Sequence, residues 1–109
     1  MAYAYKVLAQ SAPSATTNTD IYTVGAGKQA VVSTMTVANR AATSASYRIA
    51  IRPLGATLAN QHYIAYDVTL LANDTTALTL GITLSATDVV TIYASSASTS
   101  FGIFGAEIS

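Results

Sequence analysis

Large apolar residues alternate with charged or small ones in Tyr47-Arg48-Ile49-Ala50-Ile51-Arg52, and this pattern is typical of a β-strand. Successive side chains of a β-strand point to opposite faces, so Tyr47, Ile49 and Ile51 share one face. The other face carries the two arginines and Ala50. This period of two predicts a half-buried strand over 46–53, with an apolar inner face and a polar outer face.

The same period recurs along the chain. Apolar residues alternate with Thr and Gly in 78–84, the even-numbered residues are large and apolar in 64–70, and Val31, Met35 and Val37 line one face of 31–38. Turn signals separate these segments, and 56–61 fits one helical turn. The predicted strands are 3–8, 20–24, 30–39, 46–53, 62–70, 76–82, 88–94 and 100–108. Eight short strands predict an all-β protein: a single antiparallel β-sandwich, immunoglobulin-like or jelly-roll-like.

Length and charge limit the function classes. The chain has 109 residues, which is one domain's worth, so residues 1–109 are predicted to form a single domain. The lack of cysteine excludes a disulfide framework and a thiolate metal site. Five Lys and Arg balance five Asp and Glu, so no broad positive field favours nucleic acid or an anionic membrane.

The surface is expected to be poor in charge. Charged residues make up 9% of the chain, against about 25% in an ordinary soluble domain. Ala, Ser and Thr supply 48 of the 109 residues. A surface of this kind repels neighbours weakly and suits dense packing between subunits. The alternative interpretation is a solvated, Thr-rich β surface.

The N-terminal residues 1–19 combine the predicted strand 3–8 with the loop-like stretch 9–19. They could form a strand and arm that reach a neighbouring subunit. The alternative, which we favour, is a strand that pairs within its own domain, followed by a surface loop. The first residues lack a basic region followed by an apolar core, so we expect no signal peptide. No apolar run reaches about 18 residues, which predicts no membrane span.

The motifs that suggest chemistry fail in their context. Gly25-Ala26-Gly27-Lys28-Gln29-Ala30 is similar to a dinucleotide-binding loop, but such a loop must open a helix, and a strand pattern follows instead. A hairpin turn explains both glycines. His62 is the only histidine, and no serine elbow accompanies it. Asp74 and Asp88 are expected to bond to backbone groups in turns. We therefore predict no catalytic, cofactor-binding or metal-binding residue, and no enzyme.

Seven residues are candidates for contacts with other subunits. Arginine suits ion pairs across an interface, because its guanidinium group is planar and always charged. Tyrosine offers rigid, amphipathic contact area. His62, at the start of a strand, is expected to be a polar edge or interface residue. The candidates are Tyr3, Tyr5, Arg40, Arg48, Arg52, His62 and Tyr63. The alternative is that the arginines are solvated and the tyrosines pack within the domain.

Several segments resemble a family of small structural proteins encoded in tailed-bacteriophage genomes. The resemblance spans Tyr5 to Ile108, and its most specific part is His62-Tyr63-Ile64-Ala65-Tyr66-Asp67. The other segments are 22–24, 31–34, 37–40, 47–53, 78–81 and 88–90. Gly25 stands where the family pattern has proline, which affects only the type of turn. The resemblance implies a β-sandwich component of the virion, made in the host cytoplasm and without enzymatic activity.

The leading expectation is a virion structural protein on the outside of the particle. It would be a capsid decoration or cement subunit, or a component of the tail, collar or fibre base. Its partners would be other copies of itself and other virion proteins, with no cofactor. The alternative is a carbohydrate- or receptor-binding module that binds a host surface glycan through exposed tyrosines and Asn60, Gln61 or Asp67. A glycan site requires aromatic rings exposed together in a groove, whereas an assembly surface is broad and fairly flat.

Overall fold

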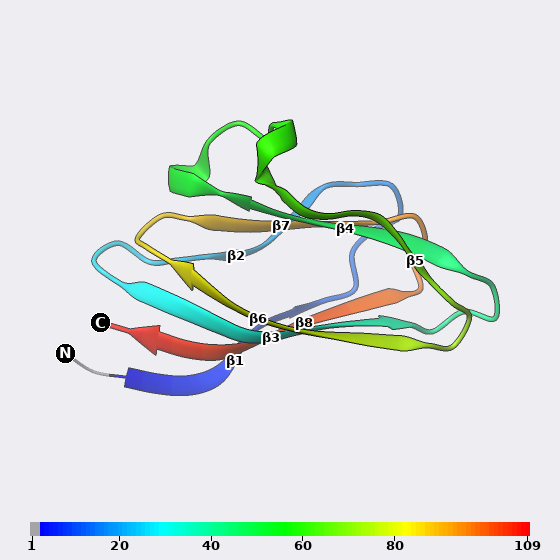
Figure 1. Ribbon diagram of the computed structural model, residues 1–109, viewed down its shortest axis with the longest axis horizontal. Coiled ribbons are helices and arrows are strands. Elements are labelled where there is room, and N and C mark those ends of the chain that lie inside the picture. The colour runs from blue at the N-terminus through cyan, green and yellow to red at the C-terminus, as the bar shows by residue number, and fades with distance from the viewer. Residues whose placement is uncertain (1–2) are drawn as a thin grey trace.

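Two four-stranded antiparallel sheets face each other in the computed structural model, which describes residues 3–109 (Figure 1). One sheet has the order β1-β8-β3-β6 and the other β2-β7-β4-β5. The strands are β1 (Tyr3–Ser11), β2 (Thr19–Thr23), β3 (Gln29–Asn39), β4 (Ala45–Arg52), β5 (Tyr63–Leu70), β6 (Thr75–Leu84), β7 (Val89–Ala94) and β8 (Thr99–Ile108). Two short 3₁₀ turns, η1 (Pro53–Gly55) and η2 (Asn60–His62), lie between β4 and β5. All eight predicted strands are therefore confirmed. The largest difference between predicted and observed bounds is at the end of β1, which was predicted as 3–8.

The eight strands pair as one long ribbon that is folded on itself. β1 pairs with β8, β2 with β7, β3 with β6 and β4 with β5, all antiparallel. Successive pairs of this ribbon alternate between the two sheets. A ribbon wrapped in this way is a double-sheet jelly roll. The predicted antiparallel β-sandwich is confirmed, and this strand order selects the jelly-roll alternative over the immunoglobulin-like one.

The hydrophobic core lies between the inner faces of the two sheets. Tyr47 of β4 and Phe101 of β8 meet there edge to face, with ring centroids 6.4 Å apart. Met35, Ile49 and Ile103 are fully buried around them. Tyr47 and Ile49 thus lie inside, as the alternation predicts, which confirms the register of β4.

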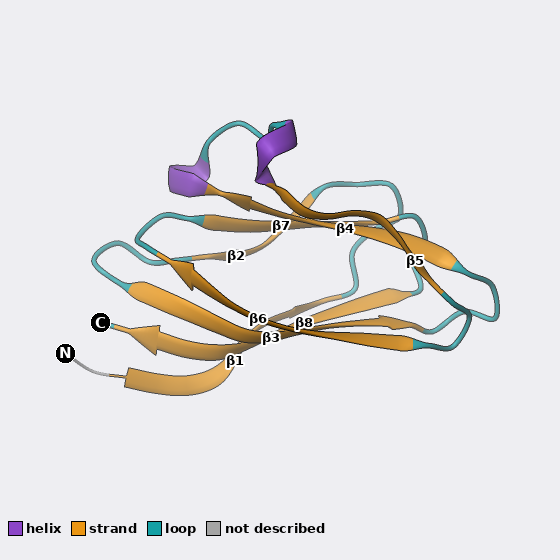
Figure 2. Cartoon of the chain, in the orientation of Figure 1, coloured by secondary structure: helices purple, strands orange, loops and turns teal. Residues whose placement is uncertain are grey.

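Ala50 departs from the predicted pattern. The alternation places it on the outer face of β4, where it was expected to be exposed, yet only 1% of its surface is accessible. The connection from β4 to β5, which contains η1 and η2, lies over the outer face of this sheet (Figure 2). Arg52 holds the connection by donating hydrogen bonds to the backbone oxygens of Gly55 and Ala56. The prediction of an exposed Ala50 is wrong, because a strand's period does not show whether a loop covers its outer face.

The N-terminal strand belongs to its own domain. β1 pairs with β8 of the same chain, as the favoured alternative predicts, and does not project as an arm. The loop after β1 is held to β7 by a 2.8 Å hydrogen bond from the backbone N–H of Thr16 to the oxygen of Ala94. Residues 1 and 2 of the predicted arm lie outside the described residues.

The glycine motif after β2 forms a turn, but not a hairpin. The backbone N–H of Lys28 donates to the oxygen of Gly25 at 3.1 Å. Gly27 has a φ of 75°, a conformation that favours glycine. The turn leads from β2 in one sheet to β3 in the other, so it crosses the sandwich. The turn itself is confirmed, whereas the prediction that it joins two paired strands is wrong.

Candidate interaction surfaces

Two β-bulges in β5 gather aromatic side chains on the outer face of its sheet. The pairing of β5 with β4 shifts twice. Ile64 is the extra residue at one shift, and Asp67, with a left-handed φ of 50°, lies at the other. Side chains three residues apart in a regular strand point to opposite faces. The bulge at Ile64 changes this, so that Tyr63, opposite Ala50, and Tyr66 lie on the same face.

Arg48 lies between two aromatic rings on this face. Its Cζ is 4.2 Å from the centroid of the Tyr66 ring and 4.3 Å from that of Tyr93. Tyr66 also meets Tyr63, with centroids 4.9 Å apart and an angle of 87° between the rings. We call Tyr63, Tyr66, Arg48 and Tyr93 the aromatic row. It crosses β5, β4 and β7, and cation–π attraction stabilises the position of the guanidinium group.

Asp67 balances the charge of the aromatic row. Nε of Arg48 donates to Oδ1 of Asp67 at 2.6 Å, and Nη2 donates to Oδ2 at 3.3 Å. The hydrogen bond to Asp67 raises the pKa of Arg48 and outweighs the opposing effect of desolvation. Because both carboxylate oxygens accept from one guanidinium group, the pair is bidentate and leaves little free charge beside the rings.

A hollow of about 520 Å³ lies beside the aromatic row and is lined by Asn60, Tyr63 and Tyr66. Tyr66 is 56% exposed, and Asn60 is exposed as well. Asn60 belongs to η2, so the connection from β4 to β5 supplies one wall of the hollow. The hollow therefore offers ring surface for stacking and an amide group for hydrogen bonding.

The connection beside the hollow is fixed by His62. This histidine is buried, and its Nδ1 accepts a 3.0 Å hydrogen bond from the backbone N–H of Ala59. The imidazole thus closes a loop of its own chain beside β5, the edge strand of its sheet, and the role of His62 as an edge or interface residue stays a prediction. No sequence pattern near His62 could have shown which backbone group its ring would meet.

The other two predicted arginines also have partners within the chain. Nη2 of Arg52 lies 2.9 Å from Oδ1 of Asp20, and its Nε donates to the hydroxyl of Thr91 at 3.0 Å. Nε of Arg40 donates to the hydroxyl of Ser100 at 2.8 Å. The roles of Arg40, Arg48 and Arg52 between subunits stay a prediction. The structure adds that each guanidinium group is already hydrogen-bonded in the single chain.

The edge of β1 is the second surface with exposed aromatic residues. Tyr3, Tyr5 and Val7 are 60%, 85% and 50% exposed. They lie on the outer face of their sheet, opposite alternate residues of β8 at 104, 106 and 108. A hollow of about 460 Å³ adjoins them. Its apolar lining consists of Tyr5, Val7, Val31, Phe104 and Ala106.

The β1 edge is open and carries little charge. Within residues 3–109, β1 has a neighbouring strand on one side only, so the backbone groups of its other side remain available. Lys6 is the only charged residue of the strand. Its Nζ lies 3.1 Å from Oε1 of Glu107, and Nζ of Lys28 lies 3.6 Å from the same oxygen. The one charge that could guard this edge is therefore engaged in an ion pair.

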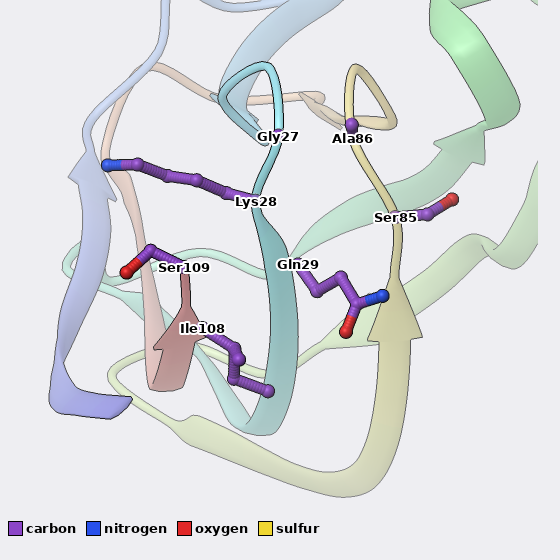
Figure 3. Close-up of a pocket in the computed structure, with 7 residues that line it drawn as sticks. All are labelled: Gly27, Lys28, Gln29, Ser85, Ala86, Ile108 and Ser109. Carbon is purple, nitrogen blue, oxygen red and sulfur yellow. The ribbon is translucent and has the colours of Figure 1, made fainter. Parts of the chain in front are cut away.

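A third hollow, of about 410 Å³, lies at the end of the sandwich where β3 begins and β8 ends (Figure 3). Figure 3 shows that the side chains of Lys28 and Gln29 extend to opposite sides of β3. They do not converge on one point, and the remaining lining is small or apolar. This hollow therefore lacks the convergent polar groups of a binding site.

The ionisable side chains form structural contacts. Among residues 3–109, no group of three His, Asp, Glu or Cys residues lies close enough to hold a metal ion. Oδ1 of Asp74 accepts from the backbone N–H of Thr75, and Asp88 accepts from the N–H groups of Leu54 and Ser85, which confirms both as turn residues. The described part of the chain has no helix that is long and apolar enough to cross a membrane.

The structure brings some of the predicted residues together. Tyr3 and Tyr5 share the β1 edge, and Arg48 and Tyr63 meet through Tyr66. Sequence reasoning missed Tyr93 and Phe104 as surface residues. Each directly follows a core residue in its strand, so the period of two could have placed both on the outer faces.

Comparisons with known proteins found no match to this chain among family models, curated proteins or solved structures.

Proposed function

We propose that this chain is a non-enzymatic structural subunit of a tailed-phage virion, which assembles in several copies on the outside of the particle. It would act as a capsid decoration or cement protein, or as a component of the tail, collar or fibre base. Its partners are other copies of itself and other virion proteins. The resemblance of segments such as His62–Asp67 to small phage structural proteins supports this proposal.

The observation that carries the proposal is the open edge of β1. Tyr5 is 85% exposed although it is a large aromatic residue, and Tyr3 and Val7 extend the same exposed row. Large apolar patches that remain exposed in a free chain mark sites of protein contact. The adjoining backbone groups of β1 allow a neighbour to add a strand, while the side chains supply the buried area.

Two further features support assembly. The zero formal net charge and the 9% of charged residues mean that copies repel each other weakly. The jelly roll is common in viral capsid domains, and also in lectins and cupins, so at the level of the fold this is an analogy only. The exposed residues of the β1 edge are observed in this chain itself, so their use as a contact surface does not depend on that analogy.

Hydroxyl-radical footprinting of the particle tests the proposal. Tyr5 and Tyr66 are both exposed in the free chain, so both are oxidised readily there. If β1 is the contact surface, oxidation of Tyr5 falls in the particle relative to the free chain. Tyr66, on the other sheet, serves as the internal reference for radical dose. Equal oxidation of Tyr5 in the two samples would contradict this use of the β1 edge.

A further inference from the structure

We infer that the hollow formed by Asn60, Tyr63 and Tyr66 is a binding site for a neutral saccharide. It lies on the outer face of the sheet β2-β7-β4-β5, whereas the β1 edge belongs to the other sheet. The inference rests on the side chains of the hollow and not on the proposed assembly. The hollow has a volume of about 520 Å³, which lies within the range of about 300–1,000 Å³ that is usual for small-molecule sites.

The side chains of the hollow match the chemistry of a pyranose ring. A sugar presents C–H groups on one side of the ring, which pack on an aromatic surface, and hydroxyl groups around its rim. Tyr63 and Tyr66 supply two rings whose centroids lie 4.9 Å apart, and Tyr66 is 56% exposed. The amide of Asn60 and the tyrosine hydroxyls can each donate and accept hydrogen bonds, which suits sugar hydroxyls.

The charges near the hollow favour a neutral ligand. A cation that approached Tyr66 would meet the guanidinium group of Arg48, whose Cζ lies 4.2 Å from the centre of that ring. An anion would have to compete with Asp67, which already accepts from Nε and Nη2 of Arg48. The hollow itself is lined by no charged residue. These contacts disfavour quaternary ammonium groups and acidic sugars alike.

The site is also organised before a ligand arrives. The bulge at Ile64 places the two tyrosines on one face, and Arg48 stacks between Tyr66 and Tyr93. Asp67 fixes the guanidinium group through a bidentate contact. Rings that are held in place lose little conformational entropy on binding, so a small ligand can bind without ordering the surface first.

The test is a titration of the isotope-labelled full chain with glucose, galactose, mannose and N-acetylglucosamine, each followed by amide NMR. The inference predicts saturable shifts for at least one sugar, at amides of 60–66 and of Arg48. Tyr66→Ala should weaken binding by about tenfold or more, since an aromatic contact is lost. Asn60→Ala, which leaves the aromatic row intact, should also weaken binding.

Two controls make the test decisive. Tyr5→Ala removes an exposed tyrosine from the other sheet and should bind as the unmodified chain does. Far-UV circular dichroism and the melting temperature verify that each variant is folded. The inference is overturned if none of the four sugars shifts these amides, or if Tyr5→Ala weakens binding as much as Tyr66→Ala. Shifts produced by N-acetylneuraminic acid but by none of the neutral sugars would overturn it as well.

Discussion

The hydroxyl of Tyr22 donates a 2.7 Å hydrogen bond to Oε2 of Glu107 and thereby joins the two sheets of the sandwich. Glu107 also binds Lys6 and Lys28 through its other oxygen. Burial raises the pKa of Tyr22, and the adjacent carboxylate raises it further. The tyrosine therefore stays protonated and acts as a donor. This contact closes the end of the sandwich next to the β1 edge.

Tyr22→Phe should lower the free energy of unfolding by about 1.5 kcal/mol, the lower end for a hydrogen bond to an ionised acceptor. The ring remains, so the change isolates the hydroxyl. Equilibrium denaturation measures the loss. In a Glu107→Gln background the same substitution should cost clearly less, because the acceptor is then neutral. Identical costs in both backgrounds would show that the two residues do not interact in solution.

The Glu107 contact also predicts a dependence of stability on pH. The hydrogen bond from Tyr22 lowers the pKa of Glu107 below its usual value of 4.5, and Lys6 adds to the effect. A lowered folded-state pKa contributes stability above the unfolded-state pKa, and this stability is lost as the pH falls through the folded-state value. Denaturation measured from pH 7 downwards should therefore show a smaller acid-induced loss for Glu107→Gln than for the unmodified chain. Parallel curves would contradict this role.

Substitutions at the neighbouring residues Ile49 and Ala50 test whether both faces of β4 are buried. Ile49→Ala should cost about 2–5 kcal/mol, because it opens a cavity in the core. Ala50→Ser should also destabilise, by about 1–3 kcal/mol, because the hydroxyl is buried under the connection from β4 to β5. Thr69→Ser, at an exposed position of β5, is the control and should change stability by less than about 0.5 kcal/mol. A neutral Ala50→Ser in denaturation experiments would mean that the connection does not cover β4 in solution.

Gly105 is required by a bulge between β3 and β8. The pairing of these strands shifts at Ser33, and a Cβ atom at Gly105 would overlap the backbone oxygen of Val31. Gly105→Ala should therefore cost about 1–3 kcal/mol or more. Gly102→Ala should cost less, since its Cβ would meet the movable side chains of Thr36 and Phe104. Thermal melting of both variants gives the comparison, and equal losses would contradict it.

The fold is largely readable from the sequence because period and turn chemistry are local properties. The alternation around Ile49 predicts its strand, its face and its burial, and the positions of Gly27 and Asp88 predict turns that the structure contains. The choice between the jelly-roll and immunoglobulin-like arrangements depends on which distant strands pair. That information is not contained in the alternation of any single strand.

The surface around the aromatic row is harder to predict, because it depends on irregularities of β5 and of the connection before it. The even-numbered residues of β5 look like a buried stripe, yet Ile64 and Tyr66 are exposed and only Leu70 is fully buried. The two bulges that cause this have no clear sequence signal, since neither contains a glycine. The burial of His62 depends on a loop contact with Ala59, which the sequence does not show either.

A substitution of Tyr5 distinguishes an effect on assembly from an effect on stability. The Tyr5 side chain is 85% exposed, so Tyr5→Ser should change the free energy of unfolding by less than about 0.5 kcal/mol. If β1 is the contact surface, the same variant should be incorporated into particles much less than the unmodified chain. Quantitative mass spectrometry of particles grown with both forms measures the ratio. Thr69→Ser, on the other sheet, is the matched control, and equal incorporation of Tyr5→Ser would contradict the assignment of β1.

A cryo-electron microscopy reconstruction of the whole particle would show whether the chain assembles in repeated copies through the β1 edge. We expect several copies around a symmetry axis, with a threefold axis as the first expectation. In each copy Tyr3, Tyr5 and Val7 should be covered by another copy or by a lattice protein. The interface that contains them should bury at least about 1,000 Å² in total. A particle that lacks the chain, or one in which these residues face solvent in every copy, would contradict the claim.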